Sequence, residues 1–323
     1  ILLNLDSEEM GSLVIGCAGG VVTICNLPFK WEKTPADLVC FKVSLTGLKG
    51  GHSGMEINLG RANANQQLAR FLWEADSIAP LELCDFEGGG LANAIPRDAF
   101  AVVAIRREDV DAFREFAAEF SNRLHAEFGA VENPDFKFEL AEHDRMERII
   151  DSETAHRLIA SVFAAPNGVQ GMSAAIPGLV ETSCNLASVH VMADNTIEIT
   201  VHIRSSVDSR RDEIANRISA LFGMIGADIK LDDAYVGWSP NPESHILKVA
   251  EKSYEDIFGT KPKIEALHAG LECGLFLEKM PGLDMVSFGP TLKDIHSPGE
   301  KANIKSVQDF WKYLKDIITR LAE

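Results

Sequence analysis

Three acidic side chains follow a short apolar run at the start of the chain. Residues Ile1 to Leu5 are typical of a buried parallel strand, and Asp6, Glu8 and Glu9 come directly after it. In open α/β sheets the carboxyl ends of the strands face the ligand crevice, where a carboxylate oxygen can bind a metal ion such as zinc. The alternative interpretation is that these acids cap the next turn.

A histidine occupies a similar place near the far end of the chain. Met285 to Phe288 form another short apolar run, and His296 follows in a loop that is rich in glycine and proline. Such a loop offers no apolar face for a histidine to fill, and imidazole is the commonest metal ligand in proteins. Asp6 and His296 are therefore candidates for one shared metal site.

Four blocks of sequence hold these and other reactive side chains among small residues. The first block has two parts, Asn4-Leu-Asp-Ser-Glu-Glu9 and Gly16-Cys-Ala-Gly-Gly20, and the other three are Gly50-Gly-His-Ser-Gly-Met-Glu-Ile-Asn58, His268-Ala-Gly-Leu-Glu-Cys-Gly274 and His296-Ser-Pro-Gly-Glu300. In this order, over almost the whole chain, they resemble the aminoacyl-histidine dipeptidase branch of the co-catalytic zinc peptidase and aminoacylase family. The resemblance implies an α/β catalytic domain with a lid, and hydrolysis of small dipeptides, above all Xaa-His, by a metal-activated water.

The resemblance also implies roles for single residues. Asp6 would bind one of two zinc ions and His296 the other, although Mn²⁺ and Co²⁺ accept similar ligands. His52, in its glycine-rich turn, would polarise the substrate carbonyl or stabilise the oxyanion, and in dimeric relatives this histidine comes from the partner subunit. The alternative for His52 is a hydrogen bond within its own turn.

Arg204 ends a predicted strand whose apolar residues alternate from Ile197 to Ile203. The resemblance implies that Arg204 binds the substrate carboxylate, a task that suits a guanidinium because it can donate two parallel hydrogen bonds. The alternative is that Arg204 lies on a solvated sheet face, which it would share with Thr200 and His202.

Three more residues are implied to contact the substrate. Asn185 would be a lid residue that binds it, and His268 and Glu272 would line its pocket beside a helix N-terminus, where backbone N–H groups suit a carboxylate. The remaining histidines are expected to be structural or exposed and are assigned no role: His125, His143, His156, His190, His202 and His245.

Members of the family also carry an earlier H-x-D pair and two adjacent glutamates, the first of which is the general base. No His-x-Asp precedes Asp6 in this chain. We therefore expect the chain to be an N-terminally truncated fragment that is inactive by itself, and the predicted function to belong to the intact protein.

The composition of the chain is that of an acidic globular protein. Its 323 residues are 46% hydrophobic and carry a formal net charge of -17, which argues against nucleic acid and anionic membranes as partners. No apolar run is long enough to span a membrane. The six cysteines show no C-x-x-C spacing, so we expect reduced thiols and a cytoplasmic location.

The pattern of strands and helices predicts an α/β catalytic domain at 1–20 and 237–323, interrupted by a lid and dimerisation insert at 21–236 that holds two α+β repeats. We expect Gly16 to Gly20 to form a loop and a helix to run from about Asn58 to Glu74. The other predicted helices are near 109–128, 153–163, 210–224, 243–257, 271–279 and 303–322, and the strands near 39–45, 81–86, 99–106, 136–140, 179–190, 197–203, 227–232, 262–267 and 284–288.

The predicted function is zinc-dependent hydrolysis of Xaa-His dipeptides by a protein that dimerises through its lid. Within the enzyme class, a zinc tripeptidase or an N-acyl amino acid deacylase is the alternative. In another class, the chain is a non-catalytic dimerisation or binding module.

Overall fold

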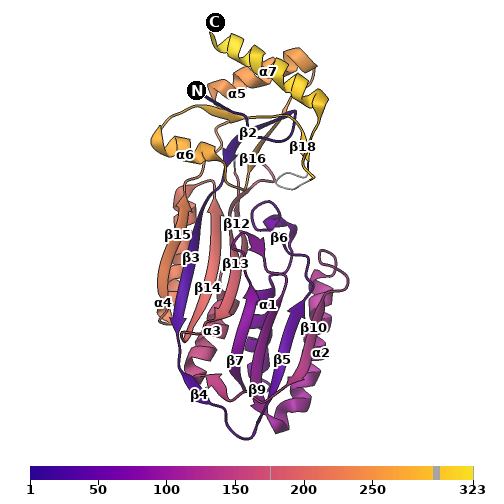
Figure 1. Ribbon diagram of the computed structural model, residues 1–323, viewed down its shortest axis with the longest axis vertical. Helices are drawn as coiled ribbons and strands as arrows, with labels where there is room; N and C mark the ends of the chain where they lie inside the picture. Colours follow the sequence, from indigo (N-terminus) through magenta and orange to yellow (C-terminus); the bar gives the residue numbers. More distant parts are fainter. Residues whose placement is uncertain (175, 294–298, 323) are drawn as a thin grey trace.

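The computed structural model describes residues 1–174, 176–293 and 299–322, and its strands form two main sheets (Figure 1). A four-stranded sheet with the order β1–β17–β2–β16 lies beside the chain's first residue and the helices α5 and α7, and a nine-stranded sheet forms the long body below it. The predicted α/β fold with a long α+β insert is confirmed.

The small sheet gathers strands from both ends of the sequence. It consists of β1 (Leu2–Asn4), β2 (Ser12–Cys17), β16 (Lys263–Leu267) and β17 (Met285–Ser287). β1 runs parallel to β17, and β16 runs parallel to β2. Helices α5 (His245–Phe258) and α7 (Ile304–Ala322) pack on this sheet around a core that includes Leu13, Ile15, Leu247, Val286, Phe288, Tyr313 and Ile317, while α6 (Glu272–Lys279) lies apart from them.

The chain passes from the small sheet to the large one through a single residue. β2 ends at Cys17 and β3 (Gly19–Pro28) begins at Gly19, so the predicted loop over Gly16 to Gly20 is wrong. These glycines instead allow neighbouring segments to approach the backbone closely. A Cβ atom at Gly19 would lie 2.5 Å from the Gly237 nitrogen, and one at Gly20 would lie 2.6 Å from the ring of Tyr235.

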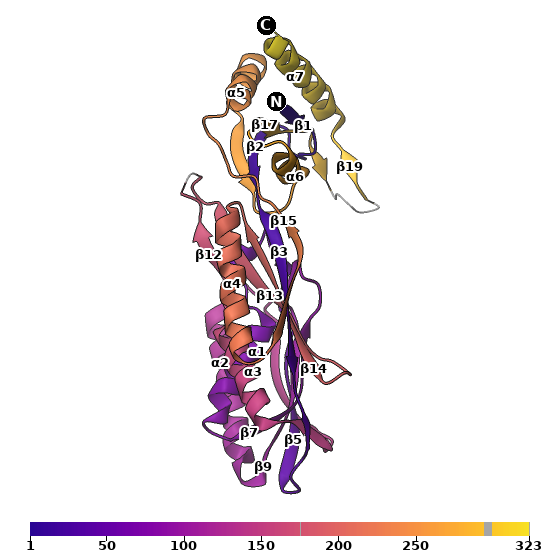
Figure 2. The same cartoon turned by 90° about the vertical axis from the view of Figure 1, so that its left-hand side faces the viewer.

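The large sheet has the order β10–β5–β9–β7–β13–β14–β3–β15, with β12 paired to β13. Four helices cover one of its faces (Figure 2). The helices are α1 (Ala64–Asp76), α2 (Val110–Phe128), α3 (Ser152–Ala164) and α4 (Asp208–Met224), and the strands are β3, β5 (Leu38–Thr46), β7 (Leu81–Gly89), β9 (Ala99–Arg106), β10 (Lys137–His143), β12 (Gly168–Met172), β13 (Val180–Val191), β14 (Thr196–Ser205) and β15 (Asp228–Tyr235).

This sheet contains the same unit twice. The first half follows the chain order β5–α1–β7–β9–α2–β10, and the second half follows β3–α3–β13–β14–α4–β15. Each half has its first strand between its third and fourth strands, and the two halves meet where β7 pairs antiparallel with β13. The first half is inserted between β3 and α3 of the second, and β4 (Trp31–Lys33) pairs with β11 (Arg148–Ile150) at the point of insertion.

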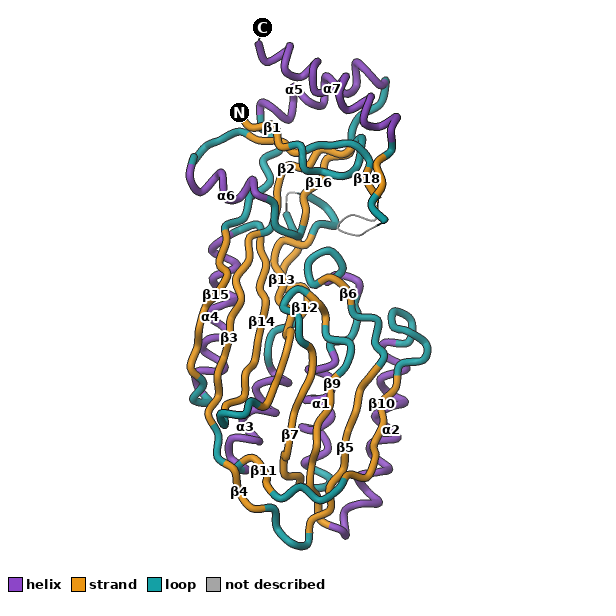
Figure 3. Tube along the Cα trace, in the orientation of Figure 1, coloured by secondary structure: helices purple, strands orange, loops and turns teal. Residues whose placement is uncertain are grey.

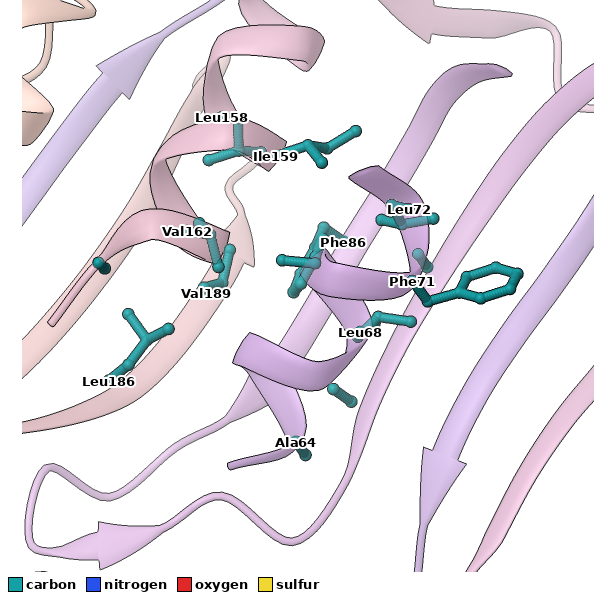
Figure 4. Close-up of a cluster of buried hydrophobic side chains, with 14 of the residues drawn as sticks. Ala64, Leu68, Phe71, Leu72, Phe86, Leu158, Ile159, Val162, Leu186 and Val189 are labelled. Carbon is teal, nitrogen blue, oxygen red and sulfur yellow. The ribbon is translucent and has the colours of Figure 1, made fainter. Parts of the chain in front are cut away.

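The main core lies between this sheet and its helices. In β14 the residues Ile197, Ile199, Val201 and Ile203 are fully buried, as their alternation predicts. Side chains from both halves meet in one continuous cluster (Figure 4), to which α1 contributes Leu68, Phe71 and Leu72, α3 contributes Leu158, Ile159 and Val162, and the central strands contribute Phe86, Leu186 and Val189.

Helix α1 begins later than its sequence pattern predicts. A short 3₁₀ helix over Ile57–Leu59 ends at Gly60, which has a left-handed φ of 70°. The α-helix starts after Asn63, whose side chain accepts a hydrogen bond from the Gln66 backbone N–H. The predicted start near Asn58 is therefore wrong. The apolar spacing of a helix continues back to this residue, but Gly60 ends the short 3₁₀ helix and separates it from α1.

The predicted division at 20/21 and 236/237 stays a prediction, although β15 ends at Tyr235 and α5 begins at His245. Two short antiparallel pairs of strands complete the described structure: β6 (Gly51–His52) pairs with β8 (Ala94–Ile95), and β18 (Leu292–Lys293) pairs with β19 (Lys301–Ala302). Among the described residues, none of the helices is both long and apolar enough to cross a bilayer.

Candidate functional site

A cavity of about 460 Å³ lies where the small sheet meets the end of the large one. Strand β6, which ends with His52, and the turn after it lie at this end of the large sheet (Figure 3). The cavity is lined from the small-sheet side by Asp6, Glu8, Glu9, Ser12, Glu265, Ala269 and Gly270, and from the large-sheet side by His52 and Met55. It therefore brings Asp6 and His52, two of the predicted site residues, to one place.

The turn after His52 binds one nitrogen of its ring, Nδ1, and leaves Nε2 for another partner. Its Nδ1 accepts hydrogen bonds from the backbone N–H groups of Gly54 at 3.1 Å and Met55 at 3.0 Å. Because Nδ1 is an acceptor, the neutral ring carries its proton on Nε2 and can donate from there. Burial, aided by the charge of Arg204, lowers the pKa of His52, so the ring is neutral at pH 7. The turn thus fixes a hydrogen-bond donor at the wall of the cavity.

Arg204 is a buried cation. Its side chain is on the face of β14 away from the helices, and only 6% of the residue is exposed. Its guanidinium donates to the Tyr235 hydroxyl at 3.0 Å, its Nε has no partner, and no carboxylate of the described part of the chain pairs with it. A buried charge without a counter-ion is costly, so this site favours an anion from outside the protein. The alternative of a solvated sheet face for Arg204 is wrong.

Tyr235 connects Arg204 to the cavity. A Cβ atom at Gly270, which lines the cavity, would lie 3.1 Å from the Tyr235 ring. On the other side, Gly20 of the neighbouring strand leaves the space that this ring occupies. The two glycines therefore let an aromatic ring stand between the sheet face and the cavity wall, with its hydroxyl toward the guanidinium.

Two more imidazoles lie close to Arg204. His268 is buried, shares a 2.7 Å hydrogen bond between its Nε2 and the Ser183 hydroxyl, and has an unpartnered Nδ1. Burial, with a smaller contribution from Arg204, lowers the pKa of His268 to about 3 and that of His202 to about 4. Both rings are neutral at pH 7. His202, for which the sequence predicts no role, is part of this group.

Asn185 and His202 hold the loop that supports His52. They face each other in the β13–β14 register. The Asn185 amide donates to the carbonyls of Ala92 at 3.2 Å and Ala94 at 2.8 Å, and His202 Nδ1 lies 3.3 Å from the Ala92 carbonyl. Ala94 is in turn the strand partner of His52. Asn185 thus acts on the backbone around His52, and its role in binding substrate stays a prediction.

The end of β1 is tied to the first turn of α6. The Asn4 side chain donates from Nδ2 to the Glu272 carboxylate and accepts at Oδ1 from the Asp6 backbone N–H at 3.1 Å and the Ser287 hydroxyl at 2.5 Å. Glu272 therefore positions the segment that carries Asp6. Neither Glu272 nor His268 is among the residues that line the cavity, and their predicted contact with substrate is untested.

The described residues do not by themselves form a metal centre. Outside 175, 294–298 and 323, no three His, Cys, Asp or Glu side chains come together as a metal site would require. His296, the second predicted ligand, lies outside the described residues. Asp6 lines the cavity with Glu8 and Glu9, and the assignment of Asp6 and His296 as metal ligands stays a prediction.

Sequence reasoning missed His202, Ser183 and Tyr235. The first two could have been found from the alternation of β13 and β14, because Ser183 pairs with Arg204 and Asn185 with His202 on one face. Five of the nine buried polar side-chain atoms without a partner in the described structure belong to this region: Ser53 Oγ, Asn185 Oδ1, His202 Nε2, Arg204 Nε and His268 Nδ1. Such a concentration of unpaired groups is typical of a ligand site.

Comparison with known proteins shows which family the chain is similar to. Residues 43–132 match the M20 family described as a peptidase dimerisation domain. The chain is 40% identical over 322 residues to the cytosol non-specific dipeptidase of Escherichia coli strain K12, covering 99% of this chain and 66% of that protein. The crystal structure of aminoacylhistidine dipeptidase from Vibrio alginolyticus superposes with a TM-score of 0.94 at 40% identity, covering 99% of this chain and 65% of that chain.

The chain thus spans slightly less than two thirds of these relatives. The structure describes this chain alone and gives no support to the prediction that it is a fragment. The matched domain corresponds to the first half of the large sheet, from within β5 to just before β10. Similarity of this extent, in sequence and in three dimensions, shows that the chain belongs to the M20 family of peptidases.

Proposed function

We propose that the protein is a metal-dependent dipeptidase that hydrolyses the peptide bond of small dipeptides, among them Xaa-His. The observation that carries the proposal is the buried Arg204 guanidinium, which has no carboxylate partner among the described residues. A dipeptide supplies such a carboxylate at its C-terminus. The proposal is further supported by the relatives, one called a cytosol non-specific dipeptidase and the other an aminoacylhistidine dipeptidase.

In this proposal the large sheet binds and orients the substrate. Arg204 holds the C-terminal carboxylate through charge-assisted hydrogen bonds, and the Tyr235 hydroxyl fixes the plane of the guanidinium. His52 Nε2 donates a hydrogen bond to the oxygen of the scissile carbonyl, on which negative charge develops as a nucleophile attacks. Because Nδ1 of His52 accepts from two backbone N–H groups, the neutral ring keeps its proton on Nε2 and can donate it in a hydrogen bond to the oxyanion.

The metal part of the proposal rests on the family and on Asp6 at the cavity wall. Bound metal ions, zinc or in its place Mn²⁺ or Co²⁺, would supply a water of lowered pKa as the nucleophile. Asp6 and His296 are the ligands we propose from this chain. We also propose a cytoplasmic location, as the name of the relative from Escherichia coli indicates for that protein.

The test is a hydrolysis assay of the intact full-length protein on Ala-His, Ala-Leu, the tripeptide Ala-Ala-Ala and N-acetyl-leucine. We expect dipeptides to be cleaved, activity to be lost after chelation and to return on addition of Zn²⁺, Mn²⁺ or Co²⁺. Preferred cleavage of the tripeptide or the N-acyl substrate would replace the proposal with one of the alternative hydrolases. No hydrolysis of any substrate by metal-loaded protein would favour the binding-module interpretation.

A further inference from the structure

One buried carboxylate holds both ends of the segment that carries His52. Glu132 follows the C-terminal end of α2, and only 7% of the residue is exposed. One oxygen of its side chain accepts a hydrogen bond from the Lys49 backbone N–H at 2.6 Å, and the other accepts from the Ala62 backbone N–H at 2.9 Å. The segment between these two residues, 49–62, contains β6 and the turn after it, and we call it the His52 loop.

The contacts of Glu132 are made to the backbone and not to a positive side chain. Among the described residues, no lysine, arginine or histidine forms an ion pair with this carboxylate. A buried carboxylate needs donors for its oxygens, and the two N–H groups supply them. In return, the N–H of Ala62, a residue that is 2% exposed, would be buried without a partner if Glu132 were removed. The two ends of the His52 loop are therefore held together by a single side chain.

A second carboxylate connects the base of this loop to the histidine itself. Arg61 forms an ion pair with Glu56 at 2.9 Å and also donates to the Gly50 carbonyl. The other oxygen of Glu56 accepts the backbone N–H of His52 at 2.8 Å. A shift at the base of the loop is therefore passed through this pair to the backbone that carries the imidazole.

Other contacts keep the His52 loop folded, so that Glu132 is needed for its position more than for its existence. β6 pairs with β8, and the Ser53 backbone N–H donates to the Asn93 carbonyl at 2.8 Å. At the base, the Arg97 side chain donates to the Leu48 carbonyl at 2.9 Å. A variant of Glu132 is therefore expected to fold with a displaced loop.

We infer that Glu132 is a positioning residue, which sets where His52 Nε2 lies at the cavity wall by holding Lys49 and Ala62 together. Glu132 is not among the residues that line the cavity, so it acts through His52. The effect on turnover rests on the proposed function, whereas the restraint on the loop does not. Because His52 is proposed to contact the oxyanion, its displacement lowers kcat more than it raises KM.

Hydrogen exchange in the full-length protein tests the restraint without any assay of activity. Glu132→Gln turns one acceptor oxygen into an NH₂ group, which cannot accept a hydrogen bond from a backbone N–H. We expect amides of the His52 loop to exchange about tenfold faster or more in this variant. Exchange at the wild-type rate would overturn the inference, whether or not the protein hydrolyses dipeptides.

Asp151→Asn is the matched control. The Asp151 carboxylate also accepts from two backbone N–H groups, those of Lys30 at 2.9 Å and Thr154 at 3.0 Å. It lies between β11 and α3, and β11 is at the end of the large sheet away from β6 (Figure 3). This variant should leave exchange of the His52 loop unchanged. Faster exchange of the loop in both variants would show a general loss of stability and would contradict the inference.

Steady-state kinetics of the full-length protein on Ala-His measure the effect on turnover. We expect Glu132→Gln to lower kcat by about 10- to 100-fold, with KM and bound metal near wild type. Glu132→Asp keeps both acceptor oxygens on a side chain shorter by one methylene, and its kcat should lie between the two. If Glu132→Gln does not fold, Glu132→Asp carries the test against Asp151→Asn, whose kcat should equal that of the wild type. Equal kcat in the Glu132 variants and the wild type would refute the positioning role.

A double-mutant cycle with His52→Ala separates positioning from a merely structural role. If Glu132 acts through His52, Glu132→Gln should lower kcat no further in a protein that already lacks the imidazole. A further 10- to 100-fold loss in that background would contradict the inference. A wild-type protein that hydrolyses no dipeptide would refute the proposed function, and hydrogen exchange would then decide alone whether Glu132 holds the loop.

Discussion

The two halves of the large sheet share one chain order but contribute to the site in different ways. The first half offers the end of the short strand β6, where His52 is half-buried and held by backbone N–H groups of the turn that follows. The second half offers the face of a long strand, where His202 and Arg204 are almost fully buried. The comparison teaches that a repeated unit can supply a half-buried hydrogen-bond donor from the end of a short strand and a buried cation from the face of a long one.

The strand face and the glycine-rich turn hold their side chains by different means. A strand face in the middle of a sheet fixes its side chains through two neighbours, and Arg204 is paired with Ser183 on one side and Gly20 on the other. A glycine-rich turn can instead approach another part of the molecule closely, as Gly54 approaches His268. We therefore expect changes on the strand to cost more than changes in the turn.

Replacement of the strand cation should have the largest effect. Arg204→Met removes the proposed partner of the substrate carboxylate, and loss of one member of a buried charged pair costs about 2–5 kcal/mol, or roughly 30- to several thousand-fold in kcat/KM. The measurement is steady-state kinetics on Ala-His, where KM should rise. Arg210→Met, an exposed arginine bound to Glu213, is the matched control and should be near wild type. Equal losses in both variants would break the assignment.

The turn donor should come second. His52→Ala removes the Nε2 donor, and loss of one oxyanion donor lowers kcat by about 100- to 1000-fold. We expect KM to change little, because the contact forms mainly in the transition state. Metal content, measured on the same samples, should be retained. A variant that loses bound metal in proportion to activity would place His52 among the ligands instead.

The buried imidazoles predict a pH dependence of stability. Burial lowers the pKa of His202 from 6.5 to about 4, so between these values the unfolded chain binds a proton that the folded chain does not. Stability from this group is complete above pH 6.5 and is lost as the pH falls toward 4, by up to about 1.4 kcal/mol per pH unit.

Urea unfolding at a series of pH values measures this contribution. In His202→Gln the free energy of unfolding should depend less steeply on pH between 4 and 6.5 than in the wild-type protein, whatever its absolute stability. Parallel curves for the two proteins would show that His202 is protonated in the folded state.

The close contact between turn and small sheet should give the smallest effect. Gly54→Ala forces the turn away from the His268 carbonyl, and we expect a loss of about 1–3 kcal/mol in stability with kcat reduced about tenfold. Gly223→Ala is the control, because nothing lies within 4 Å of its Cβ position in α4. Its stability should be unchanged or slightly higher. A neutral Gly54→Ala variant would mean that the contact does not position His52.

Many of the helices and strands can be predicted from hydrophobic periodicity, and each wrong prediction has a local cause. The alternation from Ile197 to Ile203 and the apolar stripe of α2 specify their elements, because burial of one face dictates the pattern. The Gly16 to Gly20 segment is strand except at Ala18. Its glycines allow other backbone segments to approach closely, and no local sequence pattern reveals those segments. The same holds for β3, which was not predicted.

The site was predictable in part. Asp6 and His52 line one cavity, while their roles as metal ligand and oxyanion donor stay predictions. Asn185 and His202 contact the loop at Ala92, which no spacing in the sequence connects to them. The role of a polar side chain on a strand depends on which segments cover that face of the sheet. The packing of the two halves and the small sheet decides which segments these are.

The most direct measurement is a structure of the full-length protein with a non-hydrolysable dipeptide analogue bound. The account predicts the ligand carboxylate at about 2.7–2.9 Å from the Arg204 guanidinium, with the carbonyl oxygen facing His52 Nε2. A carboxylate bound elsewhere, with Arg204 still paired only to Tyr235, would contradict it.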